Sequence, residues 1–277
     1  MSPARPVTRL DKSDVLSGLF ASWDAIDQVV GDLTDTQWSQ PTALPGWTVH
    51  DVVAHVTGTE SMLQGAGPPE VDVDVSTLEH VRNDIGVLNE RWVCKLRGLS
   101  HAELLERFRA TTAERREALT GMGEDQWHEV TMTPAGPDSY GRFMRVRTFD
   151  CFMHELDVRD AVGASPADVA GPHARLALDE MATSMGFVVG KLGKAPDGSR
   201  VRLELTGPLS RTINVAVDGR AKVVDEFDGE PTVTIALDGL LFTRLAGGRV
   251  AVAHDAVTYG GDKAVGRRIV EHLNYVI

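Results

Sequence analysis

Basic residues and long apolar runs are scarce in this sequence. Lysine and arginine number 28 against 40 aspartates and glutamates, a net charge of −12 with histidine neutral. Binding to a phosphate backbone needs a concentrated basic surface, so a nucleic-acid partner is not expected. No apolar run approaches the roughly 18 residues of a membrane-spanning helix. The first residues also lack the apolar core of a signal peptide. We therefore expect a cytoplasmic protein without a membrane partner.

Cysteine is also scarce, and several familiar catalytic patterns are missing. Cys94 and Cys151 exclude a disulfide framework, and alone they cannot complete a zinc knuckle. The glycines at 186, 190 and 193 do not form a phosphate-binding loop, and Gly-x-Ser-x-Gly is absent. We expect Cys151 to be a buried, inert thiol.

The first part of the chain has the periodicity of amphipathic helices. Apolar residues recur there at three- and four-residue spacing. Thr48 and Asp51 have the pattern of a capping box, and Ser100 is a candidate N-cap. We expect long loops over 65–77 and 121–139, which contain glycines and prolines. Helices are expected over about 15–33, 48–63, 78–97, 101–120 and 140–162. Such helices without strands predict a helical bundle.

The pattern changes after a candidate linker at 163–172. One helix is expected over about 172–191, and alternating apolar and polar residues then predict strands. Asp218-Gly219 is a hairpin signal between two of these strands. The strands are expected over 201–205, 213–217, 221–224 and 232–236, and short helices over about 238–246 and 262–274. The 277 residues therefore predict two domains, an all-α bundle over 1–163 and a smaller α+β domain over 172–277.

The helix expected over 140–162 carries the spacing that is most informative about chemistry. Asp150, His154 and Asp157 fall within an arc of about 60° beside an apolar stripe. An aspartate and a histidine one turn apart can share a cation inside a bundle. The commoner alternative for such spacing is an exposed pair on a helix flank. His55 would complete a three-ligand site, although a lone histidine among valines is more often a core residue.

Several motifs resemble those of one family. The segment Leu44-Pro-Gly-Trp-Thr-Val-His-Asp-Val-Val-Ala-His55 resembles the second-helix signature of the mycothiol-dependent maleylpyruvate isomerase family, within the DinB-like metalloproteins. Trp38 with Pro41-Thr42, His80–Asp84 with Asn89–Val93, and Arg147 leading into Asp150 and His154–Asp157 are also similar to that family. The last hundred residues resemble its sterol-carrier-like domain. The resemblance implies a DinB-like four-helix bundle followed by a smaller, sterol-carrier-like α+β domain.

The same resemblance implies a metal centre. His55, Asp150 and His154 would be the ligands of a divalent metal, and their donor types suit zinc. Asp150 stands where the family usually has glutamate, so this chain departs by one methylene at that ligand. Aspartate is an accepted zinc ligand, but the shorter reach leaves the metal's identity and occupancy open.

Further residues have candidate roles around this centre. Arg82 is a candidate for holding a substrate carboxylate, with a solvated arginine near a helix start as the alternative. The resemblance implies that Arg249, or Arg244 in competition with it, reaches the site from the C-terminal domain. Asp157 either accepts a hydrogen bond from the free ring N–H of His154 or pairs with a neighbouring arginine.

The resemblance implies a metal- and thiol-dependent enzyme. Mycothiol, the small thiol of actinobacteria, would supply a thiolate that attacks an electrophilic small molecule. Elimination after bond rotation gives a cis–trans isomerase, and a retained thiol gives an S-transferase. A zinc-dependent hydrolase and a non-catalytic protein that binds an apolar small molecule are the alternatives. We expect a monomer or a homodimer.

Overall fold

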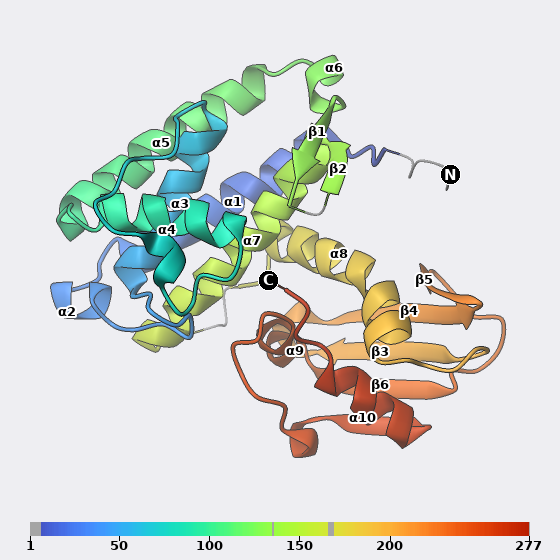
Figure 1. Cartoon of the computed structure of the whole chain (residues 1–277). Coiled ribbons are helices and arrows are strands. Elements are labelled where there is room, and N and C mark those ends of the chain that lie inside the picture. Colours follow the sequence, from blue (N-terminus) through green and yellow to red (C-terminus); the bar gives the residue numbers. More distant parts are fainter. Residues whose placement is uncertain (1–6, 135, 166–168, 277) are drawn as a thin grey trace. The chain divides into compact units, whose positions relative to one another are not determined.

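The protein is described by a computed structural model over residues 7–134, 136–165 and 169–276. The chain divides into two compact units, Met1–Pro166 and Ala167–Ile277 (Figure 1). The first unit is helical and the second combines helices with a sheet, as the sequence predicts. No helix among the described residues is long and apolar enough to cross a membrane.

Four long helices and one shorter helix form the body of the first unit. The long helices are α1 (Lys12–Val30), α3 (Val49–Leu63), α5 (His101–Gly121) and α7 (Tyr140–Val162), and the shorter one is α4 (Asp84–Leu96). Helix α1 packs on α7, and α3 packs on α4, α5 and α7. Their core contains the fully buried Trp23, Phe108 and Trp127. Short helices α2 (Asp35–Trp38), α6 (Glu124–Trp127) and η1 (Val75–Thr77) lie between the longer ones.

The starts of these helices follow local capping chemistry. The Thr48 hydroxyl accepts from the backbone N–H of Asp51, and the Asp51 carboxylate accepts from that of Thr48, so the predicted capping box is present. Ser100 caps α5 in the same way. Helix α4 begins at Asp84, later than the expected start near 78, because the Asn83 side chain accepts from the Gly86 N–H.

The expectation of one loop over 121–139 was wrong. This segment contains α6 and an antiparallel hairpin of β1 (Val130–Thr133) and β2 (Gly136–Ser139), so the bundle does include strands. Each strand has only four residues, which is too short for a clear alternation, and Pro137 weakens the strand signal further. The Thr133 hydroxyl donates to the Gly136 carbonyl across the turn.

The second unit has five strands in the order β5-β4-β3-β6-β7 (Figure 1). Strands β3 and β6 are parallel, and the other pairs are antiparallel. Asp218 pairs with Arg220 across Gly219, which confirms the hairpin signal. The strands are β3 (Arg200–Thr206), β4 (Arg211–Asp218), β5 (Arg220–Val224), β6 (Val233–Asp238) and β7 (Thr258–Gly261). The sequence did not predict β7, a short edge strand that ends in two glycines.

Helices cover this sheet. Helix α8 packs on β5 and β4, α9 contacts β6 and β3, and α10 contacts β6 and β7. Their bounds are α8 (Pro172–Phe187), α9 (Gly239–Ala246) and α10 (Lys263–Glu271), with the short turns η3 (Val188–Leu192), η4 (Gly207–Leu209) and η5 (His254–Ala256). The candidate linker follows the end of α7 at Gly163, which has the left-handed φ of 68° typical of a helix stop. Its residues 166–168 lie outside the described residues.

Candidate functional site

Helices α3 and α7 bring the three predicted ligands together in the first unit. The Nε2 atom of His55 lies 3.3 Å from Oδ2 of Asp150, and Nε2 of His154 lies 3.7 Å from Oδ1. One ligand atom from each side chain lies within 4.8 Å of the others. Asp150 is therefore not part of an isolated pair on a helix flank, and His55 is not only a core histidine.

Local packing explains why these polar side chains point inward. Helix α3 is buried on nearly all sides, and His55 lies one turn after the buried Val52. On α7, Asp150 and His154 are one turn apart, so they share one face of the helix. Both imidazoles are almost fully buried, while the Asp150 side chain is 32% exposed. The cluster is thus open to solvent on the Asp150 side.

Asp157 determines how His154 presents its ring. Nδ1 of His154 lies 3.1 Å from Oδ2 of the buried Asp157. A carboxylate can only accept, so Nδ1 of His154 is the donor in this contact, and Nε2 is the ring nitrogen that faces Asp150. This contact supports the first of the two roles considered for Asp157. The neighbouring Arg159 instead bonds Glu155 at 2.7 Å.

A buried network of charges lies behind Asp150. Two nitrogens of Arg147, Nε and Nη2, donate to Oε1 of Glu60 at 3.1 and 3.0 Å, and Nη1 donates to Oδ2 of Asp150 at 2.5 Å. Arg115, on α5, donates to the other Glu60 oxygen at 3.0 Å. Glu60 and both arginines are at most 5% exposed in their side chains. The network joins α3, α5 and α7 with two positive and two negative groups.

The ionisation of the cluster suits metal ligation. Burial would raise the pKa of Asp150, but the charges of Arg147 and His154 outweigh it and hold that pKa well below its ordinary value. Burial lowers the pKa of His55 against the opposing hydrogen bond to Asp150. At neutral pH the site therefore offers an ionised carboxylate and a neutral imidazole, the protonation states that metal binding requires.

Trp47 forms a wall beside both histidines, a position that the sequence did not predict. Its ring centroid is 5.2 Å from that of His55 and 6.2 Å from that of His154. Its Nε1 donates to Oε2 of the buried Glu90 at 2.8 Å, and Arg97 donates to Oε1 of Glu90 at 3.1 Å. The available signal was its place between Pro45-Gly46 and the capping box.

The arginines predicted to act at the site lie in different parts of the chain. Arg82 is exposed and lies two residues before α4. Arg249 is half-buried in the second unit, where its Nη1 donates to the Gly247 carbonyl at 2.6 Å. Arg244 is on α9 of the same unit. The roles of these three residues stay predictions.

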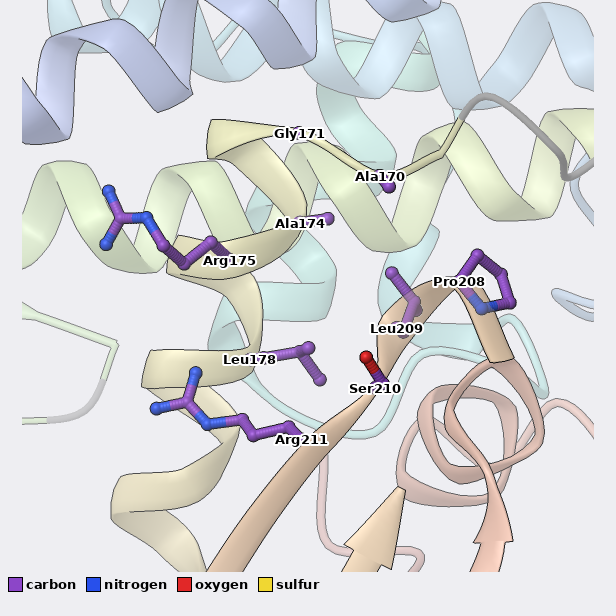
Figure 2. A pocket seen from close by; sticks show the side chains of 9 residues that line it. All are labelled: Ala170, Gly171, Ala174, Arg175, Leu178, Pro208, Leu209, Ser210 and Arg211. Atoms are coloured by element: carbon purple, nitrogen blue, oxygen red, sulfur yellow. The ribbon is translucent and has the colours of Figure 1, made fainter. Parts of the chain in front are cut away.

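The second unit contains a pocket of about 190 Å³ between α8 and β4 (Figure 2). Leu178 and Leu209 are nearly fully buried and give it an apolar wall. Arg175 and Arg211 line it as well, and both bond Asp179, at 3.3 and 2.6 Å. The full lining is Ala170, Gly171, Ala174, Arg175, Leu178, Pro208, Leu209, Ser210 and Arg211.

Two minor expectations have opposite outcomes. Cys151 is fully buried, as expected, and burial raises the pKa of its thiol to about 12, which favours an inert cysteine. His173, a histidine without a partner pattern in the sequence, would be predicted at the surface, but it is only 5% exposed. It is the second residue of α8, where the helix turns its side chain toward Gly171.

Two family models match the sequence. "Mycothiol maleylpyruvate isomerase N-terminal domain" matches residues 19–159, and "MDMPI C-terminal domain" matches residues 175–268. Among curated proteins, an uncharacterized protein present in two strains of Mycobacterium tuberculosis is 25% identical over 205 residues. That match covers 73% of this chain and 76% of the relative.

Solved structures extend the similarity to the fold. The crystal structure of a mycothiol-dependent maleylpyruvate isomerase, and that of a variant of it, superpose with a TM-score of 0.59 at 18% identity. The superposition covers 91% of this chain and 93% of the other. A UbiJ-SCP2 ubiquinone synthesis protein matches 35% of this chain with a TM-score of 0.26 and 17% identity, over 95% of its own length.

Proposed function

Because the chain belongs to the mycothiol maleylpyruvate isomerase family, we propose that it is a metal-dependent enzyme that uses mycothiol to attack an electrophilic small molecule. The observation that carries the proposal is the convergence of His55, Asp150 and His154 from α3 and α7. The proposal includes both a cis–trans isomerase and an S-transferase. The two reactions share the attack of a thiolate and differ only in the fate of the thiol adduct.

The donor set fits a divalent metal, and zinc in particular. Two imidazole nitrogens and one carboxylate oxygen form a common catalytic zinc set that leaves a position open for a small molecule. The shorter side chain of Asp150 does not prevent this, because its oxygens already lie 3.3 and 3.7 Å from the two Nε2 atoms. The exposure of Asp150 gives a small molecule access from that side.

The metal, when bound, would lower the pKa of a thiol so that thiolate is present at neutral pH. Asp157 keeps the proton of His154 on Nδ1, and Trp47 covers one side of the histidine pair against water. Arg82 and Arg249 are proposed to hold a carboxylate of the electrophile, since guanidinium binds carboxylate through two parallel hydrogen bonds.

The covalent chemistry balances without an oxidant or reductant. The thiolate sulfur forms a bond to one carbon of a conjugated double bond, whose electron pair moves onto the conjugated carbonyl group. Rotation about the resulting single bond, followed by loss of the thiolate, restores the double bond as its trans isomer. If a proton is added to the intermediate before the thiolate leaves, the product is a thioether, which is the S-transferase outcome.

The test is to strip the purified chain with a chelator, reload it with zinc and supply mycothiol with a cis-configured unsaturated keto acid. Isomerisation without net thiol consumption would identify an isomerase, and stoichiometric thiol loss an S-transferase. We expect neither reaction in the stripped protein or in the absence of thiol. Hydrolysis of a substrate without thiol would overturn this proposal in favour of the hydrolase alternative.

The pocket of the second unit favours a second candidate function, the binding of a small anion. An apolar wall beside Arg175 and Arg211 suits a short chain with one carboxylate. Its two arginines suit an anion better than the apolar small molecule of the binding-protein alternative. Titration calorimetry with short-chain carboxylates tests this function. Heat that persists unchanged in Arg211→Gln would rule out this pocket as the binding site.

A further inference from the structure

We propose that Arg147 is a positioning residue that holds the carboxylate of Asp150 in place beside His55 and His154, so that Asp150 stays directed at the proposed metal site. The inference rests on the proposed metal site and adds a residue that is not itself a ligand. Nη1 of Arg147 bonds Oδ2, which also lies 3.3 Å from Nε2 of His55, while Oδ1 lies 3.7 Å from Nε2 of His154. The arginine thus holds the carboxylate at the point where both histidines face it.

The contacts of the Arg147 guanidinium with Glu60 fix the direction in which its Nη1 atom points. Nε and Nη2 both donate to Oε1 of Glu60, so two of its three nitrogens are anchored. The group is planar, and its third nitrogen therefore points along a line determined by Glu60. That line meets Asp150 one turn farther along α7. A lysine has a single nitrogen and cannot bond both carboxylates with this geometry.

Glu60 is itself immobilised. Its side chain is fully buried, and its second oxygen accepts from Nε of Arg115, which is 3% exposed. Loss of either contact would leave a buried charge without its partner, which is strongly unfavourable. Glu60 therefore keeps Arg147 in place. Through these contacts, residues of α3 and α5 restrain the position of the Asp150 carboxylate on α7. An exposed ion pair could not restrain a ligand to this degree.

The alternative is that Arg147 only stabilises the bundle. The same helix offers a matched control in Arg159, another buried arginine with a short carboxylate contact. Arg159 bonds Glu155 and the Ser165 carbonyl, and neither of these residues belongs to the metal cluster. Arg147→Lys and Arg159→Lys make the same chemical change at similar burial. They differ in whether the arginine touches a ligand.

The experiment measures metal affinity, which needs no substrate. Chelator-stripped wild type, Arg147→Lys and Arg159→Lys are titrated with Zn²⁺ in competition with a chromophoric chelator, and the Co²⁺ forms are compared by absorption spectroscopy. We expect Arg147→Lys to lose about 10–100-fold in affinity and to shift the Co²⁺ spectrum, as for residues that orient metal ligands. Arg159→Lys should keep the wild-type affinity and spectrum, whatever its stability. Circular dichroism verifies that each variant is folded.

The outcomes separate the two proposals. If the wild type binds Zn²⁺ and both lysine variants bind it equally well, the role of Arg147 is overturned while the metal site stands. If the wild type binds no metal, the proposed function and the role of Arg147 both fail. If Arg147→Lys does not fold, Glu60→Gln replaces it. This variant weakens the anchor of Arg147 and should reduce affinity with Asp150, His55 and His154 intact.

Discussion

The two units bury very different side chains. Among the described residues, the first unit buries a series of charged groups that includes Glu60, Glu90, Arg115, Arg142, Arg147, Glu155, Asp157 and Arg159. In the second unit the buried polar residues are His173, Glu180, Ser199 and Thr243. Its arginines at the pocket, Arg175 and Arg211, have side chains that are 47% and 30% exposed. The first core contains ionic networks, while the second is mainly apolar.

This difference indicates that the first unit contains buried charges that do not increase its stability. Removing charges from water is unfavourable, and a buried ion pair is often no better for stability than apolar residues of the same size. Stability alone therefore does not account for the Glu60–Arg147–Asp150 network, and its contact with the proposed metal site offers a functional reason. The apolar second core needs no such explanation, because burial of Val201, Leu203 and Val215 suffices for a sheet.

The largest expected effect comes from loss of a ligand in the first unit. His154→Ala should reduce bound zinc from about one ion per chain to nearly none, because only two ligands would remain. Thiol-dependent turnover should fall with it. Metal analysis of the purified protein measures the effect. His272→Ala, an exposed histidine of the second unit, is the control and should keep full zinc content. Equal zinc in both variants would contradict the site.

The second effect compares one carboxylate from each unit. Glu60→Ala removes the buried carboxylate that Arg115 and Arg147 share and leaves Arg147 with Asp150, and it should lower the free energy of unfolding by about 3–5 kcal/mol. Asp179→Ala removes the partner of Arg175 and Arg211, which reach solvent, and should cost at most about 1 kcal/mol. Urea unfolding of the metal-free proteins measures both changes. Similar losses in the two variants would show that burial does not determine how much each ion-pair network contributes to stability.

A smaller effect is expected from pH. Burial lowers the pKa of His50 below its ordinary value of 6.5, against the raising effect of the Leu96 carbonyl. The unfolded chain then binds more protons than the folded chain below about pH 6.5, so stability falls as the pH falls through that region. The contribution of His50 is at most about 1.4 kcal/mol per pH unit.

Urea unfolding of the metal-free protein between pH 7.5 and 5.5 checks this sign. His50→Asn should flatten the curve in this range, because its side chain takes up no proton on unfolding. His272→Asn, which replaces an exposed histidine of the second unit, should leave the slope unchanged. A slope that is the same in wild type and His50→Asn would show that His50 does not titrate differently in the two states.

The smallest expected effect is the labelling of the two cysteines in the native protein. Both cysteines lie in the first unit, so thiol labelling reports on that unit alone. Burial raises the pKa of the Cys151 thiol to about 12, so it should remain unlabelled in the native protein, and Cys94 should react slowly. Mass spectrometry after alkylation distinguishes them, with denatured protein as the control that labels both. Rapid labelling of Cys151 in the native protein would show that the chain has a reactive thiol of its own. This would weaken the proposal that mycothiol supplies the thiolate.

Much of the fold could be predicted because its signals are local. The capping box at Thr48 and the N-cap at Ser100 lie where the sequence predicts them, since each forms within one turn of helix. The alternation at Val201–Leu205 predicts β3 for the same reason. The hairpin within 121–139 and strand β7 were missed, because four-residue strands with proline or glycine show little alternation.

The sequence by itself determined most helix starts, most strands and the shared face of Asp150 and His154, because these depend on hydrogen bonds and spacing within a few residues. The tertiary structure decided which side chains meet that face. His55 is 95 residues from Asp150, and Glu60 is 87 residues from Arg147. Such contacts depend on how α3 packs on α7, and no local periodicity contains that information. The wall formed by Trp47 and the buried charges behind Asp150 result from the same packing.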